Sequence, residues 1–186
     1  MNIANKVSIF RILSVPFFVS SLIYYSPEND FLRYVALFIF CLAVISDFVD
    51  GYLARRTRKK SSAGLILDPL ADKLLLISAF AGLRIVRNFP LGIRFPLWVT
   101  LIVISRDIII LLGALVIYLV KSKLDIHPSW WGKFTTFSQM LAVGSVLLQF
   151  KFSYIFWSAA VIFTLISGFD YIHKGFRILY GANNQL

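Results

Sequence analysis

Four aspartates lie within segments that are otherwise apolar enough to cross a bilayer: Asp47, Asp50, Asp68 and Asp72. One aspartate at the centre of a membrane helix costs about 2.5 to 3.5 kcal/mol, so four bare ones would cost roughly 10 to 14 kcal/mol. No equal number of nearby basic residues is available to neutralise them there. Clustered carboxylate oxygens suit Mg²⁺ or Mn²⁺. A divalent-metal site beside a membrane indicates phosphoryl-transfer chemistry on a lipid.

The spacing of the aspartates predicts two facing pairs. Asp47 and Asp50 are three residues apart, and Asp68 and Asp72 are four apart, so each pair shares one face of a helix. Two antiparallel helices joined by a short basic loop would bring the pairs together, and four carboxylates can bind two divalent ions. The alternative is that the aspartates form surface salt bridges with Arg55 and its neighbours. Such bridges do not require four inward carboxylates at a repeated helical spacing.

Small residues and one arginine accompany the aspartates. Gly51, Ala54 and Gly64 lie within one turn of them and would let a ligand or another backbone approach closely. Arg55 would supply a planar donor for a phosphate. The pattern therefore predicts a pocket for a phosphorylated ligand beside the metal ions.

Composition places this chemistry in a membrane. The 186 residues are 59% hydrophobic and 15% charged, with a mean hydropathy of +0.79, which is typical of a polytopic membrane protein with a single domain over residues 1–186. The net charge of +10 lies in short runs between apolar stretches, so we expect no nucleic-acid partner and contacts with anionic lipids instead. The lone Cys41 excludes an internal disulfide.

Six apolar stretches are long enough, or nearly so, to span a hydrocarbon core of about 30 Å. We therefore expect an all-α membrane protein built as a bundle of six transmembrane helices. More Lys and Arg fall on one side of these stretches than on the other, twelve against five, so both termini are expected in the cytoplasm. In this orientation the site lies at the cytoplasmic face. We expect the membrane to be the inner membrane of a bacterium. The stretches are residues 8–26, 31–53, 65–86, 96–120, 134–150 and 152–173.

The aspartates and their neighbours together form a longer pattern, DxxDGxxAR, eight residues, then GxxxDxxxD. This pattern resembles the signature of the CDP-alcohol phosphatidyltransferase family. The likeness covers most of the chain and includes Asn5, Ser8 and Arg11, which resemble the family's NxxTxxR element with Ser in place of Thr. It implies transfer of a phosphatidyl group from CDP-diacylglycerol to an alcohol, with release of CMP.

The resemblance also implies roles for individual residues. The four aspartates would bind two Mg²⁺ or Mn²⁺ ions, and Asp72 would also take the proton from the acceptor hydroxyl. The family precedent makes a homodimer plausible. The residues that would contact CDP-diacylglycerol are Asn5, Ser8, Gly51, Ala54, Arg55, Ser61 and Gly64.

Two further cations point to the acceptor. Arg106 and Lys133 are expected to face the same site, and two cations beside a metal centre favour a phosphorylated acceptor. The alternatives are an internal pair of Arg106 with Asp107 and an interfacial anchor at Lys133. The chain looks most like family members that use sn-glycerol 3-phosphate, although its Ser105–Ile108 run also resembles members that use phosphatidylglycerol, and another acceptor such as inositol phosphate stays open.

A function from another class would be an intramembrane cation channel or carrier that uses the aspartates to bind passing ions. A channel predicts metal flux across the bilayer. The enzyme predicts CMP only when CDP-diacylglycerol, an acceptor and a divalent metal are all present.

Overall fold

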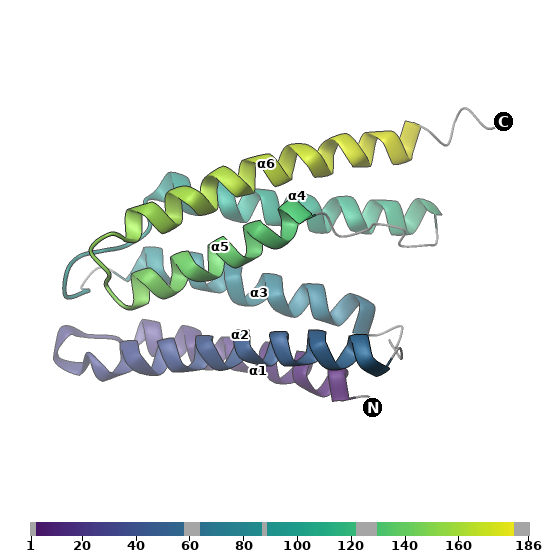
Figure 1. The fold of residues 1–186 in the computed structure, drawn as a ribbon. Coiled ribbons are helices and arrows are strands. Elements are labelled where there is room, and N and C mark those ends of the chain that lie inside the picture. Colours follow the sequence, from purple (N-terminus) through teal and green to yellow (C-terminus); the bar gives the residue numbers. More distant parts are fainter. Residues whose placement is uncertain (1–2, 58–63, 87–88, 122–129, 181–186) are drawn as a thin grey trace. The chain divides into compact units, whose positions relative to one another are not determined.

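The structure, a computed structural model, describes residues 3–57, 64–86, 89–121 and 130–180 (Figure 1). Within these ranges every regular element is a helix, which confirms the all-α prediction. The helices are α1 (Ile3–Ile23), the 3₁₀ turn η1 (Pro27–Asn29), α2 (Phe31–Thr57), α3 (Gly64–Ile85), α4 (Leu97–Lys121), α5 (Trp130–Leu147) and α6 (Ser153–Tyr180).

The helices coincide with the six apolar stretches, but several of them are longer than the apolar part. Helix α6 runs to Tyr180 and α2 runs to Thr57, several residues past the ends predicted from hydropathy. Hydropathy marks the part of a helix that suits apolar surroundings, whereas the backbone stays helical through polar residues beyond it. The additional turn of α2 carries part of the predicted site.

The described surface is apolar on every helix. Residues Phe17, Phe38, Leu101 and Ile162 are each more than half exposed. The interior, by contrast, includes many small polar side chains, which in membrane bundles hydrogen bond between and within helices. Examples of buried polar residues are Ser8, Ser14, Ser21, Thr100, Thr135, Ser138, Ser145, Thr164 and Ser167.

Length and composition identify one candidate membrane span among the side chains that the structure describes. Ser153–Lys174 of α6 meets both criteria, and Val7–Ile23 of α1 is apolar but shorter. The full count of six spans, and the cytoplasmic position of both termini, stay predictions.

The chain packs as two compact units. The first contains Met1–Phe95 and Val143–Ser153, and the second contains Pro96–Ala142 and Tyr154–Leu186. The first unit therefore combines the N-terminal half of the chain with the end of α5, which lies far from it in the sequence.

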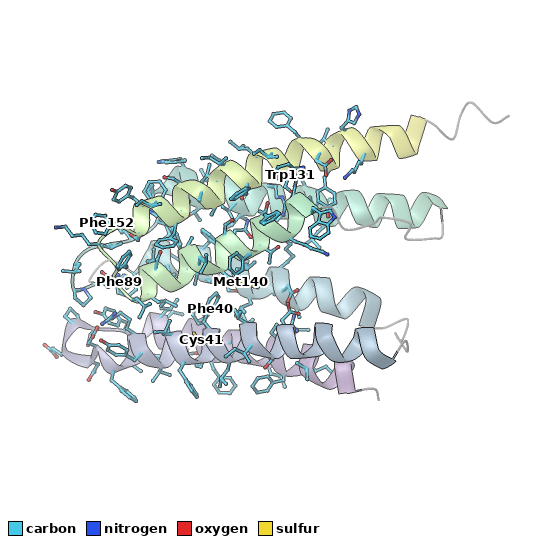
Figure 2. The ribbon with its side chains drawn as sticks, viewed as in Figure 1. Phe40, Cys41, Phe89, Trp131, Met140 and Phe152 are labelled. Carbon is cyan, nitrogen blue, oxygen red and sulfur yellow. The ribbon has the colours of Figure 1, made fainter. Side chains whose placement is uncertain are left out.

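In the first unit, α1 packs against both α2 and α3. The rings of Phe18 on α1 and Phe40 on α2 lie 6.1 Å apart, and both are buried. The neighbour of Phe40, Cys41, is exposed and free (Figure 2). Helix α3 approaches α1 closely at Gly82, where an added Cβ would lie 2.8 Å from Cδ1 of Leu22. The absence of a side chain at Gly82 therefore lets the two helices meet at this point.

The buried Arg33 links the start of α2 to the end of α5 in this unit. Arg33 donates to both oxygens of Asp30, at 2.8 and 2.7 Å, and to the carbonyl oxygen of Leu147 at 2.7 Å. This bidentate hydrogen bonding lowers the pKa of Asp30 below its ordinary value, although desolvation acts in the opposite direction. The start of α2 is thereby held to the end of α5.

The end of α5 is closed by Gln149, which has a positive φ of 52°. The amide of Phe150 bonds the carbonyl of Ser145, the pattern of a helix end that usually has glycine in the left-handed position. Glutamine takes that position here because its side chain binds a neighbouring connection. Its Oε1 accepts from the amides of Leu91 and Ile93, both at 3.3 Å, and its Nε2 donates to the carbonyl of Ile93 at 2.9 Å.

In the second unit, polar contacts join α5 to α6. The hydroxyl of Thr135 lies 2.8 Å from the carbonyl oxygen of Phe163, and Gln139 donates to the hydroxyl of Thr164 at 3.3 Å. These groups are buried, so the bonds link polar atoms of α5 and α6 inside an apolar interior.

Candidate active site

The aspartate motif occupies the two helix ends that flank residues 58–63. Asp47 and Asp50 lie in the last turns of α2, and Asp68 and Asp72 lie in the first turns of α3. The side-chain surroundings of Asp47 and Asp72 are described. Ser61 lies outside the described residues. Other predicted positions have a described helical backbone, but their side chains lie outside the described part: Asn5, Asp50, Gly51, Ala54, Arg55, Gly64 and Asp68.

Arg11 of α1 brings the two described aspartates together. Its Nη2 lies 3.0 Å from Oδ1 of Asp47, and its Nη1 donates a hydrogen bond to Oδ1 of Asp72. The Arg11 side chain is only 2% exposed, whereas the two carboxylates are 34% and 24% exposed. One guanidinium therefore joins three helices, and Asp47 of α2 and Asp72 of α3 both contact it.

Two carboxylates share one guanidinium in this cluster, at a position that is partly accessible. Lys73, the residue after Asp72, adds a second positive charge close to the Asp72 carboxylate. Each carboxylate has a second oxygen besides the one that faces Arg11. Carboxylate oxygens supplied by two helices at one point fit the preference of Mg²⁺ and Mn²⁺ for hard oxygen ligands.

Ser8 lies one turn before Arg11 on α1 and is fully buried. Ser8 is a predicted site residue, whereas Arg11 is not. The signal for Arg11 was nevertheless present, because Arg11 is the last residue of the element that begins at Asn5. Its partners could not be found from spacing, since Asp72 is 61 residues away along the chain.

Arg106 is held inside the second unit. Its Nη1 donates to Oδ1 of Asp107 at 2.7 Å, and its Nη2 donates to the hydroxyl of Ser167 on α6. The Cζ atom lies 5.6 Å from the centroid of the Tyr171 ring. Arg106 thus pairs with Asp107 and has two further partners on α6, and its role toward the acceptor stays a prediction. Helix α4 ends at Lys121, fifteen residues after Arg106, so Arg106 lies about 22 Å along the axis from this end of the helix.

Lys133 has a different environment. It is exposed near the start of α5, and its Nζ lies 4.9 Å from the centroid of the Trp130 ring. A lysine over an exposed tryptophan is the arrangement of an interfacial anchor. Lys133 therefore contacts Trp130 of α5. Arg106 contacts groups on α4 and α6.

An all-helical chain with an apolar surface, buried arginines and carboxylates drawn from neighbouring helices is a membrane protein with an ionisable functional site. The comparisons with known proteins agree with this class. The model of the CDP-alcohol phosphatidyltransferase family matches residues 1–166. This chain belongs to the CDP-alcohol phosphatidyltransferase family, and it is a membrane enzyme of phospholipid biosynthesis that transfers phosphatidyl groups.

Relatives from several bacteria carry the name CDP-diacylglycerol–glycerol-3-phosphate 3-phosphatidyltransferase. The protein of Haemophilus influenzae is 36% identical over 152 residues, which cover 81% of this chain and 77% of that protein. The Escherichia coli (strain K12) protein is 34% identical over 182 residues, 92% of this chain and 93% of its own length. The Bacillus subtilis protein is 31% identical over 201 residues, 98% of this chain and 99% of its own length.

Proposed function

We propose that this enzyme transfers the phosphatidyl group of CDP-diacylglycerol to sn-glycerol 3-phosphate, which yields phosphatidylglycerophosphate and CMP. The observation that carries the proposal is the similarity, over nearly the whole chain, to enzymes named for this acceptor. In the reaction the acceptor hydroxyl attacks the β-phosphorus, the bond from this phosphorus to the CMP oxygen breaks, and CMP leaves with the electron pair.

Asp47, Asp50, Asp68 and Asp72 would hold two Mg²⁺ or Mn²⁺ ions. When bound, such ions offset the negative charge that develops on the phosphoryl group and on the departing oxygen. The support for this assignment is the oxygen-only donor set and the convergence of Asp47 and Asp72 on Arg11.

Asp72 would take the proton of the acceptor hydroxyl as that hydroxyl attacks. A carboxylate suits this role when it lies within hydrogen-bond reach of the hydroxyl and keeps an oxygen available. Arg11 occupies one oxygen of Asp72 and fixes the orientation of the carboxylate, which leaves the other oxygen for the proton.

The diphosphate and cytidine of CDP-diacylglycerol would lie against the ends of α1, α2 and α3. The acceptor phosphate would bind Arg106 and Lys133, which supply the positive charge that a phosphomonoester needs. The residues assigned to CDP-diacylglycerol are Asn5, Ser8, Gly51, Ala54, Arg55, Ser61 and Gly64.

The setting of the reaction belongs to the same proposal. The chain would form one domain over residues 1–186 and cross a bacterial cytoplasmic membrane six times, with both termini and the active site in the cytoplasm. It would act as a homodimer among membrane lipids, without a nucleic-acid partner.

The decisive experiment offers the purified protein labelled CDP-diacylglycerol together with one acceptor at a time and identifies the lipid formed. We expect phosphatidylglycerophosphate and CMP with sn-glycerol 3-phosphate, and loss of both products in EDTA. Formation of cardiolipin from phosphatidylglycerol, or of a product from inositol phosphate alone, would overturn the assigned acceptor. Metal flux into protein-containing vesicles without any CMP would support the channel instead.

A further inference from the structure

The guanidinium of Arg106 is oriented by two helices. Asp107 binds Nη1 from the same helix, whereas Ser167 binds Nη2 from α6. Tyr171 lies one turn after Ser167, so both residues share the face of α6 that meets Arg106. Between them, Gly168 also lies beside the stem of the arginine, where an added Cβ would be 3.6 Å from Cγ of Arg106, an ordinary van der Waals contact.

Neutralising the arginine does not require these contacts with α6. Asp107 is fully buried and already provides the opposite charge at 2.7 Å. A serine hydroxyl in an apolar helix commonly bonds a carbonyl of its own preceding turn. At Ser167, Oγ accepts a hydrogen bond from Arg106, and with Asp107 it fixes the plane of the guanidinium.

This arrangement leaves donors unused. A guanidinium has five N–H donors in a rigid fork, and the contacts above use two of them. The Nε of Arg106 is buried and has no hydrogen-bond partner among the described residues. An unsatisfied buried donor is costly, and an anionic oxygen would satisfy it well. The contacts with Asp107, Ser167 and Tyr171 thus hold a donor group ready for an anion.

We propose that Ser167 and Tyr171 of α6 are positioning residues that set the orientation of Arg106 toward the phosphate of the acceptor. The inference rests on the proposed function, because Arg106 is assigned there to the acceptor phosphate. It adds that acceptor recognition depends on α6 as well as on the helix that carries the arginine.

The first test is Ser167→Ala in the full-length protein. Loss of a hydrogen bond to a charged group predicts a roughly tenfold rise in KM for sn-glycerol 3-phosphate. The value of kcat and the KM for CDP-diacylglycerol should stay within about twofold. Ser167→Thr keeps the hydroxyl and should restore the wild-type KM.

The chain offers a matched control one turn earlier on α6. Thr164 is also fully buried, and its hydroxyl bonds the carbonyl of Ala160 at 2.6 Å and accepts from Gln139. Thr164→Val removes a buried hydroxyl that does not contact Arg106, so it should leave the KM for the acceptor unchanged. An equal rise in KM for Thr164→Val and Ser167→Ala would show a general packing effect and overturn the positioning role.

Two variants of Tyr171 distinguish the effect of its ring on the acceptor KM from the effect of its hydroxyl. Tyr171→Phe keeps the ring near Arg106 and should leave the acceptor KM unchanged. Tyr171→Leu removes the cation–π contact and should raise this KM about three- to fivefold. Equal KM values for wild type and Tyr171→Leu would remove Tyr171 from the proposal.

The last test combines Ser167→Ala with Arg106→Ala, or with Arg106→Lys if the alanine variant does not fold. Because Ser167 acts through Arg106, Ser167→Ala should add little to the KM of an Arg106 variant. If Arg106→Ala leaves the acceptor KM unchanged, the assignment of Arg106 to the acceptor is wrong. A different outcome is that Arg106→Ala raises this KM and that adding Ser167→Ala raises it again by the same factor as in the otherwise wild-type protein. In that case the positioning role is wrong, whereas the assignment of Arg106 to the acceptor stands.

Discussion

Two buried arginines in the first unit meet their carboxylates in opposite ways. Arg33 has one carboxylate, Asp30, which it binds through two nitrogens, and its third nitrogen donates to a backbone carbonyl. Arg11 has two carboxylates, and each receives one nitrogen. The Arg33 cluster is balanced in charge and satisfied in hydrogen bonds, whereas in the Arg11 cluster two carboxylates share one guanidinium and each has only one oxygen facing it.

This difference separates stabilisation from function. A buried ion pair that is balanced and fully bonded can hold connections together without further ligands. A cluster in which two carboxylates share one guanidinium leaves carboxylate oxygens that a cation or a proton can bind. The same side-chain chemistry therefore forms a structural tie at Arg33 and a candidate active site at Arg11.

The largest expected effect follows from changing one aspartate in each cluster. Asp72→Asn should lower turnover at least about a thousandfold, because a general base contributes roughly 10² to 10⁴ and a metal ligand is weakened as well. Asp30→Asn makes the same chemical change at the structural cluster and should keep most of the turnover. Release of CMP measures both. Near-normal turnover in Asp72→Asn would refute the role of this residue as the base.

Removing each arginine sharpens the comparison. Arg11→Met and Arg33→Met both leave a carboxylate without its buried partner, so each should lower the free energy of unfolding by about 3 kcal/mol. Thermal unfolding in detergent measures this loss. Only Arg11→Met should also lower the turnover of the folded fraction, since Arg33 belongs to the structural cluster with Asp30. Equal turnover in the two variants would contradict the separation of roles.

The pH dependence of stability tests the Arg33 cluster alone. Because Arg33 lowers the pKa of Asp30 in the folded protein, the unfolded chain takes up this proton first as the pH falls. The stabilisation is complete above the ordinary aspartate pKa of about 3.9 and is lost as the pH falls below it. The melting temperature of wild type should therefore fall more steeply than that of Asp30→Asn between about pH 5 and pH 3. Parallel curves would show that this pair adds no acid-sensitive stability.

The smallest expected effect concerns the helix end beside Arg33. Gln149→Ala keeps a side chain at positive φ and loses the bonds to the neighbouring connection. Gln149→Gly loses the same bonds but suits the left-handed backbone, so it should be more stable than the alanine variant by about 1 kcal/mol. Denaturant unfolding of the two variants measures this difference. A more stable alanine variant would contradict a left-handed conformation at this position.

The sequence by itself determined the helices and the places of the aspartates along them. Apolar runs long enough to span a bilayer are local properties, so the positions of the helices follow from them, with errors of several residues at ends such as those of α1, α5 and α6. The motif from Asp47 to Asp72 is also local, because a spacing of three or four residues places side chains on one helix face. The family followed from the same motif.

Tertiary structure decided which side chains meet. Arg11 could be counted from the sequence as one more basic residue, but its contacts with Asp47 and Asp72 depend on how α1 packs against α2 and α3. For Arg106, Asp107 follows directly in the sequence, but only the packing of α4 against α6 brings Ser167 and Tyr171 to the guanidinium. A partner for a buried charge is chosen by distance and geometry between helices, which spacing within one helix does not contain.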